Sequence, residues 1–286
     1  MQNHKPMLVK KFSGELVPLN KSSLMYSLSK SGASQQEVAK VFTGIEAQLY
    51  SEITTKKLYQ LAFNELKKIR KSYAARYSLK KALRDLGPDG YNFEIWVTRF
   101  FEEIGCQATH SQTLKGTAVN HEIDVIAIKD GKLQLAECKF RNDVDAKIPV
   151  TTPMYFLSRF NDLKENEFEF FGQKLKPATG WLITNAYLTL DAVSFANYYG
   201  IELISWNYPE KSNIKTRVDS GGLYPITCLT SLNKLQKNIL LKEEIVLVKD
   251  LLLHINKVVS LIKLTNNQQR KLSEEAQELI FSKKIK

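Results

Sequence analysis

The sequence predicts a multidomain α/β protein with a small, mostly helical N-terminal domain, an α/β core around a mixed central sheet, and a helical C-terminal module. Three observations predict this architecture. Asp130-Gly131 separates two apolar runs, as in a β-hairpin. Two buried strands flank a helix between residues 180 and 206, as in a parallel β-α-β unit. Residues 86–90, Leu-Gly-Pro-Asp-Gly, end the helical pattern that precedes them. The expected domains span residues 1–86, 87–210 and 211–286.

The hairpin places charged residues opposite one another. A type I′ turn needs positive φ at both central positions, which Asp130-Gly131 supplies. With that turn, Asp124 faces Glu137 and Glu122 faces Lys139. Because side chains alternate between the faces of a strand, these four are expected on one face, at the end far from the turn.

Opposed carboxylates in an apolar hairpin need an explanation. Like charges directly opposite destabilise a sheet, and buried carboxylates are costly unless they are paired or bind a metal. A divalent cation between Asp124 and Glu137 would explain the pattern. Alternatively, Glu122 and Lys139 form a salt bridge while Asp124 and Glu137 lie at a solvated edge. The residue pattern alone leaves both open.

Composition excludes several classes of protein. No apolar run approaches the roughly 20 residues of a membrane-spanning helix, and no apolar segment of a signal peptide follows the N-terminus. The three cysteines are widely spaced, as reduced thiols of a cytoplasmic protein are. Residues 1–85 hold 16 Lys and Arg against 6 Asp and Glu, and so account for most of the net charge of +11. A polyanionic partner, nucleotide or nucleic acid, is expected there; the alternative is a solvated basic surface.

The N-terminal segment predicts two short strands around Ser13-Gly14, followed by helices. A helix cap is expected at Asn20 or at Ser22-Ser23, and Ser34 with Glu37 is expected to form a capping box. A third helix begins after Thr54-Thr55, and a further helical stretch covers residues 73–86.

This segment is similar to the ATP-cone, the nucleotide-binding regulatory module of ribonucleotide reductases and their transcriptional repressor. The matching motifs are Val9-Lys10-Lys11 before Gly14, Leu19-Asn20, Ser31-Gly32-Ala33-Ser34, Ile53-Thr54-Thr55 and Ala75-Arg76-Tyr77. The resemblance implies ATP or dATP as a regulatory ligand. Lysines beside a glycine turn and a helix N-terminus suit an anion, in agreement with that implication. The candidate nucleotide-binding residues are Val9, Lys10, Lys11, Asn20 and Lys21.

The central segment predicts an α/β module with a mixed sheet of four or five strands. In order, it has a helix over 89–105, an exposed strand over 106–114, the hairpin, a helix from 151, an irregular insertion over 165–178, a strand over 180–185, a helix over 188–199 and a strand over 201–206. Glu94 lies in the first turn of the first helix, where a carboxylate is favourable to the helix dipole.

Asp124 and the Glu137-Cys138-Lys139 triplet resemble the PD-(D/E)XK nuclease signature, in the Mrr-type, restriction endonuclease-like branch. The resemblance implies Mg²⁺, or Mn²⁺, bound by Asp124, Glu137 and the backbone carbonyl of Cys138, which are hard oxygen ligands. Lys139 would then orient or deprotonate the attacking water, and Glu94 would be an outer ligand. Arg159 could contact phosphate or form a structural salt bridge.

These features together predict a metal-dependent endonuclease acting on DNA, with an ATP- or dATP-binding regulatory domain. The order of domains resembles a bacterial protein family with that combination. We expect a homo-oligomer without a membrane partner. The alternative is a non-catalytic, nucleotide-responsive protein that binds nucleic acid on a nuclease-like fold. Residues 207–286 predict helices that either grip a nucleic-acid backbone or pack and dimerise.

Overall fold

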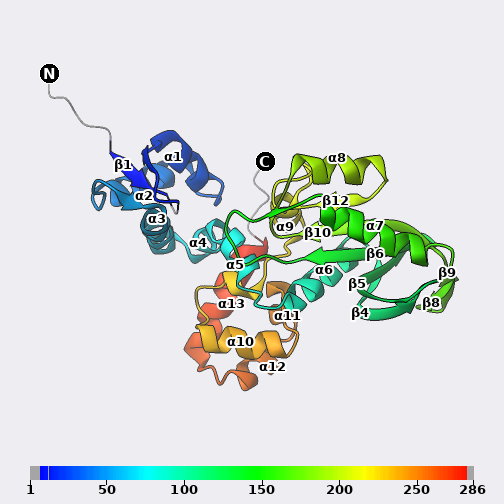
Figure 1. Cartoon of the computed structure of the whole chain (residues 1–286). Coiled ribbons are helices and arrows are strands. Elements are labelled where there is room, and N and C mark those ends of the chain that lie inside the picture. Colours follow the sequence, from blue (N-terminus) through cyan, green and yellow to red (C-terminus); the bar gives the residue numbers. More distant parts are fainter. Residues whose placement is uncertain (1–6, 12, 282–286) are drawn as a thin grey trace. The chain divides into compact units, whose positions relative to one another are not determined.

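The computed structural model describes residues 7–11 and 13–281, which form two compact units (Figure 1). The N-terminal unit comprises Met1–Leu79, Cys228–Asn233 and Asn266–Lys286. The α/β unit comprises Lys80–Thr227 and Lys234–Thr265. Residues after 211 are therefore shared between the two units.

The N-terminal unit contains a three-stranded sheet of order β2-β1-β3. Strands β1 (Leu8–Lys10) and β2 (Leu16–Pro18) are antiparallel, which confirms the predicted hairpin. Gly14 in their turn has φ +86°, a conformation that glycine adopts without a steric penalty. Strand β3 (Ile53–Thr54) pairs in parallel with β1 and was not predicted, because two residues give no periodicity.

Three capped helices pack against this sheet. They are α1 (Lys21–Ser29), α2 (Gln35–Glu46) and α3 (Thr55–Ile69). The side chain of Asn20 accepts a 2.8 Å hydrogen bond from the Ser23 amide, and Ser34 with Glu37 forms the predicted capping box. Apolar side chains of these helices form one buried cluster with Val9 and Ile53.

The stretch expected as one helix over 73–86 is two helices, α4 (Lys71–Tyr77) and α5 (Leu79–Arg84). Ser78 separates them with a non-helical ψ of 4°, and its hydroxyl donates to the Ala75 carbonyl. Within the N-terminal unit, α4 packs against α13 (Asn266–Phe281), one of the helices predicted within residues 207–286.

The α/β unit is built on a five-stranded sheet of order β12-β10-β6-β5-β4. Strands β4 (Gln107–Lys115), β5 (Asn120–Lys129) and β6 (Lys132–Lys139) are antiparallel. Strands β10 (Pro177–Thr184) and β12 (Glu202–Ile204) extend the sheet in parallel. The predicted mixed sheet and the parallel pair joined by α8 (Leu190–Tyr198) are confirmed.

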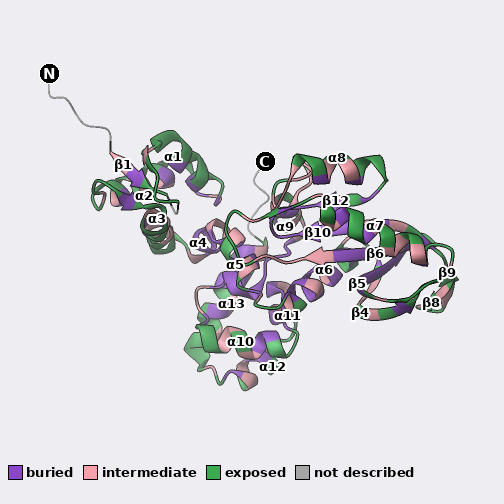
Figure 2. Ribbon diagram, in the orientation of Figure 1, coloured by how far each residue is buried: buried purple, intermediate pink, exposed green. Residues whose placement is uncertain are grey.

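Helices cover both faces of the sheet, whose central strands are buried (Figure 2). On one face, Leu163 of α7 (Thr151–Leu163) packs with Ile126 and Leu135. On the other, Phe101 of α6 (Tyr91–Glu103) meets the Trp181 ring edge-on at 5.6 Å. Short strands β7 (Lys147–Ile148) and β11 (Tyr187–Leu188) form a separate parallel pair.

The insertion over 165–178 is not irregular, as expected, but forms a hairpin of β8 (Phe168–Phe170) and β9 (Gln173–Leu175). Phe168 and Phe170 flank the exposed Glu169 and pack on the apolar cluster that includes Leu163. That Phe-Glu-Phe alternation was the signal for a strand.

The remaining elements of the C-terminal region are helical, as predicted. They are α9 (Ile214–Gly221), the 3₁₀ turn η1 (Ile226–Cys228), α10 (Lys234–Lys242), α11 (Val248–Leu253) and α12 (Ile255–Leu261). None of the described helices combines the length and the apolar character needed to cross a membrane.

Candidate active site

The far end of the β5–β6 hairpin brings the predicted carboxylates together. Asp130 and Gly131 have φ +51° and +68°, and the ladder keeps the predicted register as far as Val125 opposite Ala136. Beyond that pair, the Cys138 amide donates a 2.6 Å hydrogen bond to Asp124 Oδ2. A side chain thus replaces the backbone partner at the point where the ladder ends.

Glu137 lies between two cations. Its side chain is 6% exposed, and its Oε2 accepts a 2.5 Å bond from Arg159 Nη1 of α7. Lys139 Nζ lies 3.6 Å from the other oxygen, Oε1. The sequence left Arg159 open between phosphate contact and salt bridge, and the structure has the salt bridge.

The expected Glu122–Lys139 pair does not form. Glu122 is exposed and lies opposite Thr113 of β4, while the ion-pair partner of Lys139 is Glu137. The prediction extended the ladder past Val125, where β5 and β6 no longer pair.

Asp124 and Glu94 share a strongly acidic environment. Burial, followed by the charge of Glu137, raises the pKa of Asp124 to about 7. Burial and then the charge of Asp124 raise the pKa of Glu94 to about 7 as well. Glu94, which belongs to α6, therefore lies close enough to Asp124 for their charges to interact. The helix dipole alone does not explain its position.

The end of strand β6 is held by its parallel neighbour. The Thr184 hydroxyl donates a 2.5 Å bond to the Lys139 carbonyl. The Asn185 side chain accepts from the Arg141 amide and donates to the Arg141 carbonyl, each at 2.8 Å. These bonds fix the backbone at Lys139 and at Arg141, two residues later.

The carboxylates do not form a complete metal cage by themselves. Within residues 7–11 and 13–281, no three His, Cys, Asp or Glu side chains lie close enough together to hold an ion. Asp124, Glu137 and the Cys138 carbonyl are oxygen donors of the kind that Mg²⁺ accepts while it keeps several waters.

The predicted nucleotide residues lie along β1 and the start of α1. Val9 is buried in the core, whereas Lys10 and Lys11 are exposed. Lys11 pairs with Glu15 at 2.9 Å. Lys21 pairs with Glu46 at 2.7 Å, and Asn20 caps α1. Both ion pairs are exposed, where such pairs contribute little and exchange easily for another anion.

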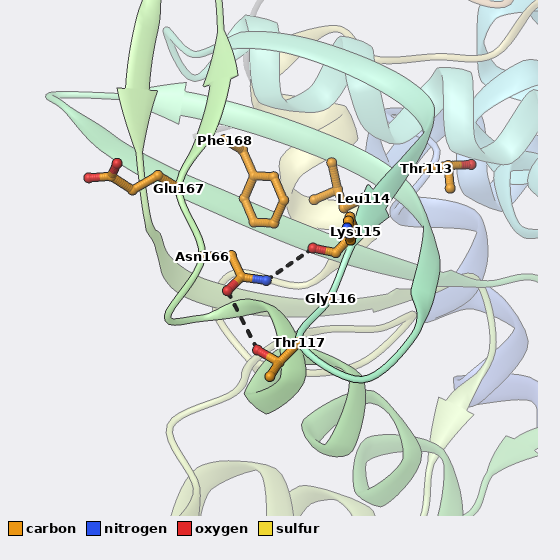
Figure 3. A pocket seen from close by; sticks show the side chains of 8 residues that line it. All are labelled: Thr113, Leu114, Lys115, Gly116, Thr117, Asn166, Glu167 and Phe168. Atoms are coloured by element: carbon orange, nitrogen blue, oxygen red, sulfur yellow. Dashed lines mark hydrogen bonds between the residues drawn. The ribbon is translucent and has the colours of Figure 1, made fainter.

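A pocket of about 530 Å³, which the sequence did not predict, lies at the end of β4 (Figure 3). Its lining residues are Thr113, Leu114, Lys115, Gly116, Thr117, Asn166, Glu167 and Phe168. Asp162 fixes its loop by accepting bonds from the Ala118 and Val119 amides. A Cβ on Gly116 would approach the Asp162 carboxylate to 2.1 Å, so glycine was the signal for this tight turn.

Comparison with known proteins identifies the relatives of this chain. The family described as AF1548-like, C-terminal, matches residues 224–280. An uncharacterized protein of Archaeoglobus fulgidus is 36% identical over 137 residues, covering 46% of this chain and 71% of that protein. The crystal structure of AF1548, a protein of unknown function, aligns with a TM-score of 0.54 and 30% identity over 68% of this chain and 99% of that one.

Can2 from Sulfobacillus thermosulfidooxidans, in complex with cyclic tetra-adenylate, is a distant neighbour. It is 14% identical, with a TM-score of 0.32, and the alignment covers 72% of this chain and 56% of that one. Nothing about this chain follows from so low a score. By its fold the chain is a mixed α/β protein with a helical C-terminal region. It belongs to the AF1548-like family.

Proposed function

We propose that this protein is a metal-dependent endonuclease that hydrolyses phosphodiester bonds of DNA. The observation that carries the proposal is the convergence of Glu94, Asp124, Glu137 and Lys139 from α6, β5 and β6 at one end of the sheet. Burial and then mutual repulsion raise the pKa values of Glu94 and Asp124, and a cation would be favourable beside such acidic groups. The resemblance of the Asp124 and Glu137-Cys138-Lys139 pattern to Mrr-type PD-(D/E)XK nucleases supports the same function.

The donor set fits a hard divalent cation. Asp124, Glu137 Oε1 and the Cys138 carbonyl would hold Mg²⁺ or Mn²⁺, with Glu94 as an outer ligand. Such an ion offsets charge on the phosphate and lowers the pKa of a bound water. Arg159 occupies Oε2 of Glu137 and so leaves Oε1 directed toward Lys139.

Lys139 has the second role in the proposed chemistry. Its ammonium lies on the same strand as Glu137, and the Thr184 bond to its carbonyl fixes the backbone from which the side chain extends. From there Lys139 Nζ would orient the attacking water and balance the charge of the scissile phosphate. Without this fixed backbone, the Lys139 ammonium would spend less time in the productive geometry.

A cleavage assay tests the proposal. Supercoiled plasmid and linear DNA are incubated with Mg²⁺, Mn²⁺ or EDTA, and Asp124→Asn and Lys139→Met are compared with Lys132→Met. Lys132 is an exposed lysine at the other end of the same strand and serves as the matched control. We expect cleavage only with metal, at least about 100-fold loss in the two site variants, and no change in the control.

Two results would count against the nuclease. Wild-type protein that retards DNA in a gel but cleaves nothing would support the non-catalytic, nucleic-acid-binding alternative. Cleavage that persists unchanged in Asp124→Asn and Lys139→Met would assign the activity to a contaminant or to another site.

We further propose that the N-terminal unit is an ATP-cone that binds ATP or dATP. The supporting observation is the pair of exposed lysines, Lys10 and Lys11, beside the turn of β1 and β2. Ligand at about 100 times its Kd stabilises the state it binds by about 2.7 kcal/mol. A rise in Tm with ATP that is lost in Lys10→Ala/Lys11→Ala, but kept in Lys40→Ala on α2, would support it. Unchanged Tm with either nucleotide would contradict it.

A further inference from the structure

The pairing of β4 with β5 is interrupted at one residue, Ser111. The ladder pairs His110 with Val125 and Gln112 with Ile123, but Ser111 and Asp124, which lie between them, are not paired. Ser111 has φ +53°, in the left-handed region that residues other than glycine adopt uncommonly. Such conformations cost free energy and cluster at functional sites.

The interruption coincides with a change of face in β5. His121 contacts Asp162 of α7 at 2.8 Å, and Ile123 belongs to the same apolar cluster as Leu163 of that helix. Ile126 belongs to that cluster too, although strict alternation would put residues 123 and 126 on opposite faces. The alternation therefore breaks once between them, at the position of Asp124.

The Ser111 side chain is directed at the acidic cluster, which consists of Glu94, Asp124 and Glu137. Its hydroxyl donates a 3.3 Å hydrogen bond to Glu94 Oε2, and His110 Nδ1 lies 3.2 Å from the same hydroxyl oxygen. Burial and the charges of Asp124, Glu122 and Glu137 all raise the pKa of Glu94, whereas the Ser111 hydrogen bond lowers it. The Ser111 hydroxyl thus contacts the Glu94 carboxylate directly.

We propose that Ser111 is a positioning residue: its left-handed conformation interrupts the β4–β5 pairing opposite Asp124 and directs its hydroxyl to Glu94, the outer ligand of the cation that Asp124 and Glu137 would hold. This inference rests on the proposed function. A hydroxyl that acts only through Glu94 does not itself touch the metal or the phosphate.

A different cause of the interruption predicts different behaviour. β4 is an edge strand, and proteins interrupt edge strands to prevent pairing with another chain. Protection of an edge needs the distorted backbone but no hydroxyl. Variants that separate the hydroxyl from the backbone conformation therefore distinguish the two causes.

Three substitutions make that separation. Ser111→Ala removes the hydroxyl and keeps the strained conformation, Ser111→Gly removes the hydroxyl and relieves the strain, and Ser111→Asn tolerates the left-handed region and retains a donor. Ser194→Ala, at an exposed serine of α8, is the control. Mn²⁺ binding is measured by calorimetry on the full chain, and kcat and KM for DNA cleavage are measured separately.

Positioning through the hydroxyl predicts that Ser111→Ala and Ser111→Gly both bind Mn²⁺ about three- to tenfold more weakly and lose kcat, with KM for DNA unchanged. Ser111→Asn restores most of the loss. In a Glu94→Gln background, Ser111→Ala has no further effect, because the two residues act as one unit.

The inference is overturned if Ser111→Gly behaves as wild type while Ser111→Ala does not, since the backbone alone would then matter. It is also overturned if all three variants match Ser194→Ala. Both results leave the nuclease proposal standing as long as the wild type binds Mn²⁺ and cleaves DNA. A wild type that does neither refutes the proposed function itself.

Discussion

Glu275 of α13 and Glu137 of β6 are both almost fully buried, with 2% and 5% of the residue exposed, but their partners differ in kind. The Glu275 carboxylate accepts bonds from the Thr230 amide at 2.6 Å, the Ser231 amide at 2.8 Å and the Ser231 hydroxyl. The Glu137 carboxylate is instead paired with the side chains of Arg159 and Lys139 and shares its surroundings with two further carboxylates.

The comparison shows that burial of a carboxylate does not by itself mark a functional site. Glu275 is satisfied by neutral donors of its own unit, as a structural carboxylate is. Around Asp124 and Glu94, burial and then repulsion between carboxylates raise the pKa values, and such perturbed groups cluster at functional sites. The two regions should therefore respond to mutation in opposite ways.

The largest expected effect is on activity at the acidic cluster. Asp124→Asn should lower DNA cleavage by at least about 100-fold, which is about 2.7 kcal/mol or more in the activation barrier. Its free energy of unfolding without metal should stay the same or rise at pH 8, because a buried charge under repulsion has been removed. Urea denaturation checks this, and marked destabilisation at pH 8 would show that Asp124 is structural.

Glu275→Gln should lower the stability of the protein rather than its activity. An amide cannot accept from all three donors as the carboxylate does, so we expect about 2–3 kcal/mol of destabilisation in urea unfolding. Cleavage per folded molecule should be unchanged. Glu274→Gln, at a neighbouring carboxylate whose side chain is 60% exposed, is the control and should change stability by less than about 0.5 kcal/mol.

Substitution of one partner of Glu137 and one partner of Glu275 tests the same difference between the two regions. Arg159→Met leaves the buried Glu137 with Lys139 alone, so we expect about 2 kcal/mol of destabilisation, part of which Mn²⁺ restores. Ser231→Ala removes one bond to Glu275 and should cost about 1 kcal/mol, with no restoration by Mn²⁺. Thermal melts with and without Mn²⁺ measure both. Equal responses to Mn²⁺ would remove the distinction between the two regions.

The smallest expected effect is on the pH dependence of stability. The pKa values of Asp124 and Glu94 are about 7 in the folded protein, above their ordinary values of 3.8 and 4.5. Between those ordinary values and about 7, the folded state holds protons that the unfolded chain has released. Stability contributed by these groups therefore falls as pH rises from about 4 to 7.

Asp124→Asn should flatten this slope, whereas Glu275→Gln should leave it in place. Urea midpoints at several pH values between 4 and 8, without divalent metal, measure the difference. A slope that is the same in wild type and in Asp124→Asn would contradict the raised pKa of Asp124.

Local rules predicted the β5–β6 hairpin and its register. Asp130-Gly131 can satisfy a type I′ turn, and once the turn is set, the period of two residues fixes the register, which the ladder keeps as far as Val125 opposite Ala136. The caps at Asn20 and Ser34 were likewise predictable, because a capping side chain bonds to backbone only three residues away.

The same rules failed where a distant element intervenes. Glu122 was expected opposite Lys139, but the pairing of β6 with β5 ends at Ala136, whereas its pairing with β10 continues to Lys139. The β8–β9 hairpin was missed because a strand of three residues, Phe168–Phe170, offers only one alternation, and its aromatic residues pack on the apolar cluster of the sheet.

The sequence by itself determined which residues carry charge at the end of the hairpin, and that a mixed α/β sheet surrounds them, because turn chemistry and periodicity act over a few residues. Only the tertiary structure decided that Arg159 pairs with Glu137, that Glu94 approaches Asp124, and that Ser111 interrupts the β4–β5 pairing opposite it. Those contacts join segments far apart in the chain, where the packing of helices on the sheet, rather than local preference, sets the geometry.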